Sequence, residues 1–196
     1  MFRVTKPTAA AIEEMIAAAE RLPSNQSEFL SIQNGLEGRR LPFFFAHDFS
    51  KSRIGNGESN FATAWRAFEE WEMFNLAWAR VANPLARIDK GQIVAVEVRS
   101  LGVWSVNLSH IVETLNTPTQ FGFTYKTTSM HVEEGEECFL LELEPGSGEV
   151  TYRLEAVSRP QDVFTRLGLP VTRVFQHRFA RDSHRRMREI VSPVAV

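Results

Sequence analysis

The chain has 196 residues, of which 43% are hydrophobic and 11% aromatic, enough for a substantial core and too apolar for a disordered chain. The net charge is −2, so the surface as a whole lacks the basic character of a nucleic-acid-binding protein. The single cysteine, Cys138, excludes an internal disulfide and a cysteine-based zinc site. Its place in the apolar run Cys138–Leu141 favours a small buried side chain over a nucleophile.

No apolar run approaches the roughly 18 residues that a membrane-spanning helix needs. The alanine-rich stretch after Pro7 contains Glu13 and Glu14, which do not fit the apolar region of a signal peptide. We therefore expect a soluble cytoplasmic protein. Residues 1–40 are predicted to form an N-terminal helix-and-loop extension packed on a single globular domain of residues 41–192.

The first half of the chain is predicted to be rich in helix. Its expected elements are a helix over Ala9–Leu22, a loop over Ser24–Arg40, a short apolar strand over Leu41–Ala46, an irregular segment over His47–Gly57 and a helix over Phe61–Met73. Thr8 is the expected N-cap of the first helix, and Pro23 ends it. Ser59 or Asn60 is the expected N-cap of the second helix.

The second half is predicted to be rich in strands and to end in a helix. The expected strands are Ile93–Val98, Trp104–Leu108, His110–Leu115, a pair that flanks Met130–Gly135, and Glu149–Val157. Turns are expected at Asn116–Pro118 and Pro145–Gly148, and Ser158–Pro160 is expected to end the last strand. A short helical segment over Val163–Leu167 and a long helix over Val171–Val191 complete the chain.

The segment Gln120–Phe139 carries the most informative pattern. Phe121, Phe123 and Tyr125 alternate with other residues, which is typical of a strand that buries one face in an antiparallel sheet. A strongly curved sheet cannot bury its concave face on itself. The long C-terminal helix is therefore expected to cover that face and to leave a cavity.

The C-terminal helix has an apolar and a basic side. Val174, Phe175, Phe179 and Met187 recur at helical spacing and predict a stripe that faces the core. The opposite side carries six arginines, which are Arg173, Arg178, Arg181, Arg185, Arg186 and Arg188. A solvated basic face is the favoured interpretation, and contact with an anionic membrane or a nucleic-acid backbone is the alternative.

His131 is followed closely by four acids, Glu133, Glu134, Glu136 and Glu137. The favoured interpretation is a charged hairpin tip in water. In the alternative, His131 and Glu136 face the mouth of the cavity and fix a polar group of a ligand. A metal site is the least favoured interpretation, because no second histidine lies at ligand spacing.

Three further features have both a structural and a functional interpretation. Arg159 in the run Ser158–Pro160 is expected to pair with a nearby acid, and a ligand carboxylate or phosphate is the alternative partner. Gly55–Gly57 is expected to be a plain turn, since it lacks the third glycine and the lysine of a phosphate site. The tryptophans are expected in the core, although Trp104 beside Asn107 is also a candidate for a pocket wall.

Five segments of the chain resemble one protein family. They are IGNGESNFATAWRAFEEWEMF from Ile54, WSVN from Trp104, FGFTYKTTSMHVEEGEECF from Phe121, SRP from Ser158 and FQHRFARDSHRRM from Phe175. In this order they resemble the bacterial and plant family called domain of unknown function 1990 (DUF1990, UPF0548), over about Ile54–Arg188. The preceding segment QSEFLSIQNGLEGRR departs from the family pattern.

The resemblance implies an α+β fold of the helix-grip type, similar to START and Bet v 1-like (SRPBCC) proteins. In that fold a curved antiparallel sheet wraps around a long C-terminal helix. Such proteins commonly hold lipids, sterols, polyketides or other apolar small molecules. The resemblance supplies no catalytic residues, and the element order predicted from the residues themselves agrees with the fold.

We therefore expect the chain to bind a small hydrophobic or amphipathic molecule between the sheet and the C-terminal helix. The expected ligand-contacting residues are Trp104, Asn107, Phe121, Phe123, Tyr125, His131, Arg159 and Phe175. One alternative is an enzyme of the cyclase, dehydratase or hydrolase type with His131, Glu136 and Tyr125 as proton-handling groups. The other is an interaction module that uses the basic helix face. No cofactor, metal site or nucleic-acid partner is predicted, and the oligomeric state is left open.

Overall fold

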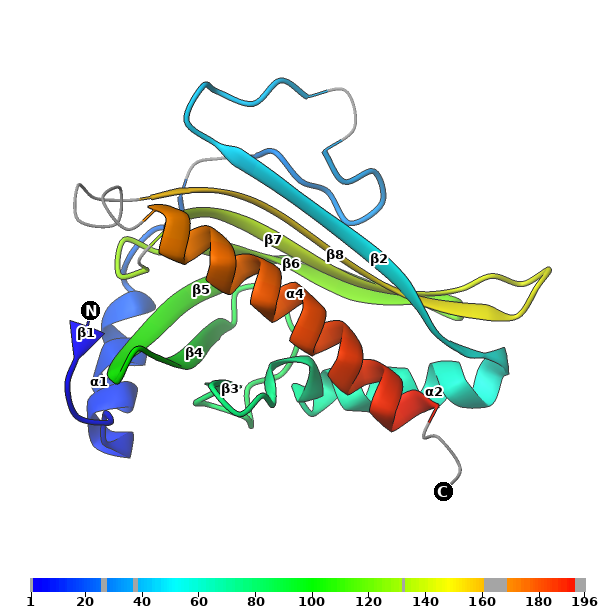
Figure 1. The fold of residues 1–196 in the computed structure, drawn as a ribbon, viewed down its shortest axis with the longest axis horizontal. Helices are drawn as coiled ribbons and strands as arrows, with labels where there is room; N and C mark the ends of the chain where they lie inside the picture. Colours follow the sequence, from blue (N-terminus) through cyan, green and yellow to red (C-terminus); the bar gives the residue numbers. More distant parts are fainter. Residues whose placement is uncertain (1, 26–27, 37–38, 132, 161–168, 193–196) are drawn as a thin grey trace.

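The structure, a computed structural model, describes residues 2–25, 28–36, 39–131, 133–160 and 169–192. An antiparallel sheet curls around a long C-terminal helix (Figure 1). The strands are β1 (Phe2–Arg3), β2 (Ala46–Asn56), β3 (Ala79–Val81), β4 (Ile93–Ser100), β5 (Val103–Thr117), β6 (Gln120–Thr127), β7 (Glu133–Leu143) and β8 (Glu149–Pro160). The helices are α1 (Ala9–Ala19), α2 (Gly57–Glu69), the short 3-10 helix η1 (Glu72–Phe74) and α4 (Leu169–Val191).

The order of the strands makes an open half-barrel. Neighbours run β2-β8-β7-β6-β5-β4-β3, and β1 pairs with β5. Every described pair is antiparallel. With α4 lying across the concave face, this is the helix-grip arrangement, and the predicted fold class is confirmed.

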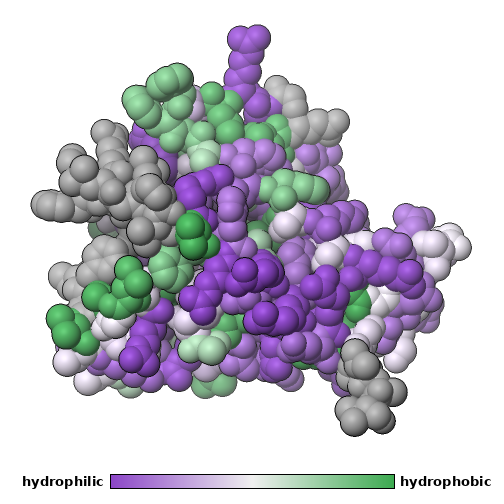
Figure 2. Space-filling model, viewed as in Figure 1, coloured by the Kyte–Doolittle hydropathy of each residue, from purple (hydrophilic) through white to green (hydrophobic). Residues whose placement is uncertain are grey.

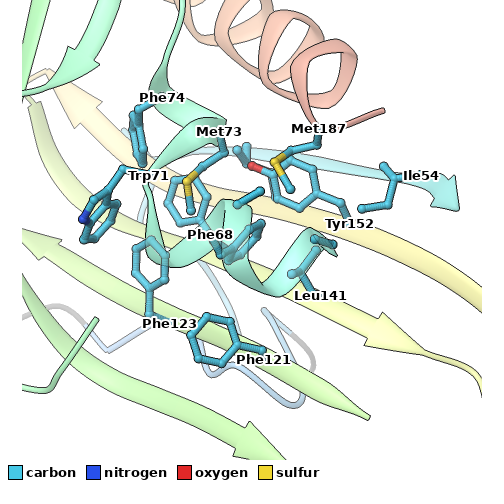
Figure 3. Close-up of a cluster of buried hydrophobic side chains, with 14 of the residues drawn as sticks. Ile54, Phe68, Trp71, Met73, Phe74, Phe121, Phe123, Leu141, Tyr152 and Met187 are labelled. Carbon is cyan, nitrogen blue, oxygen red and sulfur yellow. The ribbon is translucent and has the colours of Figure 1, made fainter. Parts of the chain in front are cut away.

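One half of the concave face is filled by aromatic packing under α2. Phe121 and Phe123 point to this face, as their alternation predicts, and Phe68 of α2 packs on them. The rings of Phe68 and Tyr152 meet edge to face with centroids 5.4 Å apart. Figure 3 shows the cluster, in which Met187 of α4 closes over the ring of Tyr152.

The N-terminal segment packs on the convex face. Ile12 and Ala19 of α1 lie against Ile93 and Leu108 of β4 and β5. Next to them, a loop places its side chains over β7 and β8, where Leu30, Ile32, Cys138, Leu140 and Val157 form a third buried cluster. The burial of Cys138 agrees with its interpretation as a small hydrophobic residue.

Three carboxylates of the sheet hold that loop by its backbone. Glu136 accepts hydrogen bonds from the N–H groups of Phe29 and Leu30 at 2.9 and 3.0 Å. Glu113 accepts from Ile32 at 3.0 Å. Glu155 does the same for Leu36 at 3.0 Å. A loop on an apolar surface needs such partners because its backbone donors are shielded from water.

The helix ends follow the predictions in part. Thr8 caps α1, since its Oγ1 accepts from the N–H of Ala11 at 3.2 Å. Helix α2 begins about one turn earlier than expected, at Gly57 with Asn56 as N-cap, so neither Ser59 nor Asn60 is the cap. It ends at Glu69 and not at Met73, because Trp71 adopts a left-handed backbone with φ 60°.

The prediction for residues 41–57 is wrong. Of the expected strand Leu41–Ala46, only Ala46 lies in a strand, as the first residue of β2, and Phe43 and Phe44 are 93% and 66% exposed. The segment expected to be irregular forms the rest of β2. β2 is an edge strand whose residues read as polar, and its hydrogen bonds come from β8, about a hundred residues away. Local sequence therefore carries little sign of it.

Smaller differences concern β5, β8 and the last helix. β5 is one continuous strand, and β8 runs through Ser158–Pro160, which we expected to end it. Val174 is 64% exposed and lies off the buried stripe of α4. The predicted helical segment Val163–Leu167 lies outside the described residues. Within the part of the chain that the structure describes, no helix is long and apolar enough to cross a membrane.

The packing under α2 predicts a large loss of stability for Phe68→Ala. The ring is fully buried, so its removal leaves a cavity and is expected to lower the free energy of unfolding by about 3–5 kcal/mol. Urea denaturation followed by circular dichroism measures this. Phe43→Ala is the matched control, and because its ring is exposed it is expected to change stability by about 0.5 kcal/mol or less. Equal losses for both variants would contradict the packing.

Candidate ligand-binding cavity

A cavity of about 550 Å³ occupies the half of the concave face that α2 does not fill. It lies between the sheet and the first half of α4, with η1 and β3 beside it. Its apolar wall includes Phe74, Trp78, Val96, Leu154, Phe175 and Phe179. Trp78 and Phe175 pack with ring centroids 5.7 Å apart, so part of this wall is built from α4 itself.

Strand β7 turns from apolar to acidic along one face. Leu141 and Phe139 are buried in the cluster under α2, and further along the same face Glu137 and Glu133 line the cavity. Residues two apart on a strand share a face, so the acids continue the row of the aromatics. The period of two thus places these carboxyl groups inside the molecule.

Both carboxyl groups accept hydrogen bonds from neutral donors. The hydroxyl of Tyr125 donates to Oε2 of Glu137 at 2.7 Å. The amide Nε2 of Gln176 on α4 lies 2.9 and 3.1 Å from the two carboxyl oxygens of Glu133. It also lies 2.8 Å from Oγ of Ser158. Gln176 therefore connects the helix to the acidic end of the cavity.

The environment raises the pKa of both acids. Burial raises the pKa of Glu133 to about 7, with a further contribution from the charge of Glu137, although Gln176 and Arg173 act in the opposite direction. Burial likewise raises the pKa of Glu137 to about 7, against the hydrogen bond from Tyr125. Near neutral pH each group is divided between the protonated and charged forms, so it can donate, accept or transfer a proton.

His131 also lines the cavity and is partly buried. Its Nδ1 lies 3.0 Å from both the backbone oxygen and the backbone nitrogen of Glu133. Burial lowers the pKa of His131 to about 4, so the ring is neutral at neutral pH.

The prediction that this region is a charged hairpin tip in water is wrong, because His131 is partly buried and lines the cavity. The alternative placed both His131 and Glu136 at the cavity, and it is wrong for Glu136. That side chain points to the convex face and accepts hydrogen bonds from the N–H groups of Phe29 and Leu30.

A second polar group lies where β2 meets α4. Nδ1 of His184 is 2.8 Å from Oγ of Ser52, and its Nε2 is 2.9 Å from Oγ of Ser50. Burial, together with the charge of Arg188, lowers the pKa of His184 to about 4. Ser50 and His184 line the cavity. Sequence reasoning missed this group, and the one signal for it was the alternation of small polar residues on the segment we expected to be irregular.

The residues expected to contact a ligand divide into two sets. Asn107, Tyr125, His131 and Phe175 line the cavity. The remaining four lie elsewhere, and they are Trp104, Phe121, Phe123 and Arg159.

Each of the four has another contact. Trp104 lies beneath the charged ends of Lys6 and Arg99, 5.6 and 5.7 Å from its ring centroid. Phe121 and Phe123 belong to the cluster under α2, as described above. Arg159 donates to Glu134 at 2.7 and 3.0 Å, the ion pair that the sequence favoured. Among the described residues, no group of three or more His, Cys, Asp or Glu side chains could hold a metal ion.

Acids from α4 and from η1 pair with the arginines on this side of α4. Asp182, on the same helix, has ion pairs with Arg178, Arg181 and Arg185 at 3.2–3.4 Å. Arg186 pairs with Glu72. Figure 2 shows mainly hydrophilic side chains over this helix. These pairs fit a solvated face whose charge is partly compensated.

The two cavity acids predict a specific dependence of stability on pH. Their folded-state pKa is raised from an ordinary 4.5, so their contribution to stability is complete below 4.5 and is lost as pH rises through about 7. Glu137→Gln removes one titrating group. Between about pH 5 and about pH 8 the variant is expected to lose on the order of 2 kcal/mol less stability than the wild type.

Denaturant unfolding of both proteins at several pH values across this range measures the free energy of unfolding. His131 and His184 have a lowered pKa, so their contribution to stability changes with pH in the opposite direction. Because the wild type and the variant both contain these histidines, the difference between the two curves cancels that contribution. Glu14→Gln, which alters an exposed carboxyl on α1, is the control and should follow the wild type. Parallel curves for Glu137→Gln and the wild type would exclude a raised pKa at this site.

The chain is similar in sequence to a known protein family. The model of the family described as "Domain of unknown function (DUF1990)" matches residues 32–186. A "UPF0548 protein" of Dictyostelium discoideum is 31% identical over 158 residues, which cover 75% of this chain and 73% of that protein. A "UPF0548 protein" of Deinococcus radiodurans is 29% identical over 195 residues, covering 92% of this chain and 94% of that protein.

Similarity to solved structures concerns the fold. The di-domain ARO/CYC protein BexL from the BE-7585A biosynthetic pathway superposes with a TM-score of 0.54 at 14% identity. The similarity covers 77% of this chain and 51% of that protein. The family model spans most of the chain, and the Dictyostelium relative adds a match of 31% identity. The chain therefore belongs to the DUF1990 (UPF0548) family.

Proposed function

We propose that this protein binds a small hydrophobic or amphipathic molecule in the cavity between the sheet and α4. The observation that carries the proposal is the cavity itself, about 550 Å³ with largely aromatic and aliphatic walls. Sites for small molecules typically measure about 300–1,000 Å³, with apolar walls and a few polar groups. The proposal keeps the cytoplasmic location that the sequence predicts.

The arrangement of side chains gives the ligand an orientation. An apolar body would lie along Phe74, Phe175 and Phe179, where burial of its surface provides the binding free energy. Its polar group would lie at the other end, within reach of Asn107 and Tyr125. Hydrogen bonds there would fix the orientation of the ligand, because an unpaired polar group in this cavity would be costly.

A second candidate function is proton-transfer catalysis in the same cavity. The observation in its favour is the pair Glu133 and Glu137, two carboxyl groups with a pKa of about 7 in an apolar setting. Such groups suit general acid and base chemistry at neutral pH. Glu136, which the sequence offered for this role, has no part in it because it faces the convex side.

Deuterium incorporation into a long-chain ketone tests this second candidate. The wild type in D2O is expected to exchange the α-protons of decan-2-one faster than the double variant Glu133→Gln/Glu137→Gln does, since the variant lacks the two carboxyl groups whose raised pKa suits them to act as a base near neutral pH. Mass spectrometry of the extracted ketone measures the exchange. Equal rates for the two proteins would remove the enzyme hypothesis and leave the binding proposal in place.

The binding proposal is tested with the neutral fluorescent probe N-phenyl-1-naphthylamine. Saturable binding with enhanced fluorescence is expected for the wild type. Ala180→Trp adds a large ring to the cavity wall and should weaken binding by about tenfold or more, equivalent to about 1.4 kcal/mol. Ala18→Trp, the same change on the exposed side of α1, should leave binding unchanged. Failure of the wild type to bind neutral apolar probes would overturn the proposal.

A further inference from the structure

The acidic end of the cavity contains two carboxyl groups that only neutral donors contact. Glu137 receives the hydroxyl of Tyr125, and Glu133 receives the amide of Gln176. No described side chain donates to the second oxygen of Glu137, Oε1. Neither acid forms an ion pair within the described residues. Buried carboxylates are usually paired with a cation, so this pair lacks its usual partner.

Arg173, whose charge acts on Glu133, forms its ion pair with a different acid. Arg173 of α4 makes two hydrogen bonds to the carboxylate of Asp48 on β2, and Nη2 lies 2.9 Å from Oδ1. His177 lies 3.2 Å from the same oxygen. The charge of Arg173 lowers the pKa of Glu133, but burial, the largest effect, raises it. The Asp48 carboxylate acts in the opposite direction, because its charge raises the pKa of both cavity acids.

The other basic groups that face the cavity do not compensate the acids either. Arg181 pairs with Asp182, with its Nε 3.2 Å from Oδ1. His131 and His184 are neutral, since burial lowers the pKa of each to about 4. The described lining therefore combines apolar walls with an excess of negative charge.

Asn107 of β5 provides an independent observation. It lines the cavity, is 8% exposed, and its side-chain oxygen Oδ1 has no hydrogen-bond partner among the described residues. Its nitrogen Nδ2 lies 3.5 Å from Oγ of Ser105. A buried acceptor without a donor is destabilising, because the hydrogen bonds it makes in water are not replaced. This oxygen and the carboxylates all call for a ligand that donates hydrogen bonds.

We infer that the molecule bound in this cavity carries a protonated amine or another cationic donor group that lies against Glu133 and Glu137, while an apolar body fills the rest. This inference rests on the proposed binding function and names the class of ligand. A carboxylate or phosphate at the same position would meet like charge and further acceptors, which costs affinity. A neutral alcohol would satisfy the acceptors but would leave the two charges uncompensated.

Binding of a cationic ligand is coupled to the ionisation of the two acids. A bound cation stabilises the charged form of each acid, so binding an amine near pH 7 must release protons to the buffer. By linkage, the affinity for the amine must rise as pH increases through about 7. An alkylammonium group titrates near 10.4, like lysine, and so remains charged over this range. A neutral ligand brings no charge to the acids, so its affinity is expected to change much less with pH.

Three probes with the same ten-carbon chain test the inference: decylamine, decan-1-ol and decanoate. Each displaces N-phenyl-1-naphthylamine from the full chain at about pH 6 and about pH 8. Decylamine is expected to bind about tenfold or more tightly than decan-1-ol at the higher pH, and more tightly there than at the lower pH. Decanoate should bind most weakly. Calorimetry in two buffers of different ionisation enthalpy should show proton release with decylamine alone.

Two variants on the same strand localise the effect. Glu137→Gln should bring the affinity for decylamine close to that for decan-1-ol, whereas Glu134→Gln, which alters an acid paired with Arg159, should keep the preference. The pH dependence and the proton release need no variant, so they decide the matter even if Glu137→Gln does not fold. Equal binding of amine and alcohol at both pH values would overturn the inference and leave the proposed function standing. Binding of none of the probes would overturn both.

Discussion

The concave face of the curled sheet has to be covered, and the lengths of the helices decide how. Helix α2 has 13 residues and is about 20 Å long, whereas β7 with 11 residues extends for about 36 Å. Helix α4 has 23 residues and is about 35 Å long, so it runs the length of the face, while α2 fills only one half. The half without α2 is spanned by α4 alone and contains the cavity.

The two faces of β7 then take different roles at its acidic end. On the convex face, Glu136 binds the backbone of the N-terminal loop and fixes it to the sheet. On the concave face, Glu133 and Glu137 enter an apolar space in which each carboxyl is costly to ionise. The same cluster of acids therefore anchors one part of the chain and gives the cavity its chemical character.

Sequence reasoning recovered the sheet because its evidence is local. The alternation of Phe121, Phe123 and Tyr125 marks a strand with one buried face, and the apolar spacing of α4 marks the helix that covers it. Strand β2 was missed because its polar residues become a strand only through pairing with β8. Propensity cannot detect a partner that lies a hundred residues away.

The candidate site was less predictable than the fold. Period two implies that Glu133 and Glu137 share a face that Glu136 does not, but the concave side is defined only by the curvature of the whole sheet. Gln176 and His184 come from α4, and no local pattern connects them with the acids or serines that they contact. Sites assembled from distant elements leave a weak trace in sequence.

Two carboxyl groups held in an apolar cavity give the proposed site its chemical character, and carbon-13 NMR of the glutamate side chains observes them directly. A titration of the labelled protein should show two carboxyl signals with midpoints near pH 7, assigned by their loss in Glu133→Gln and Glu137→Gln. Both midpoints should move to lower pH when decylamine is present. If every glutamate titrates near its ordinary value of 4.5, with or without the amine, the acids face water and the account is wrong.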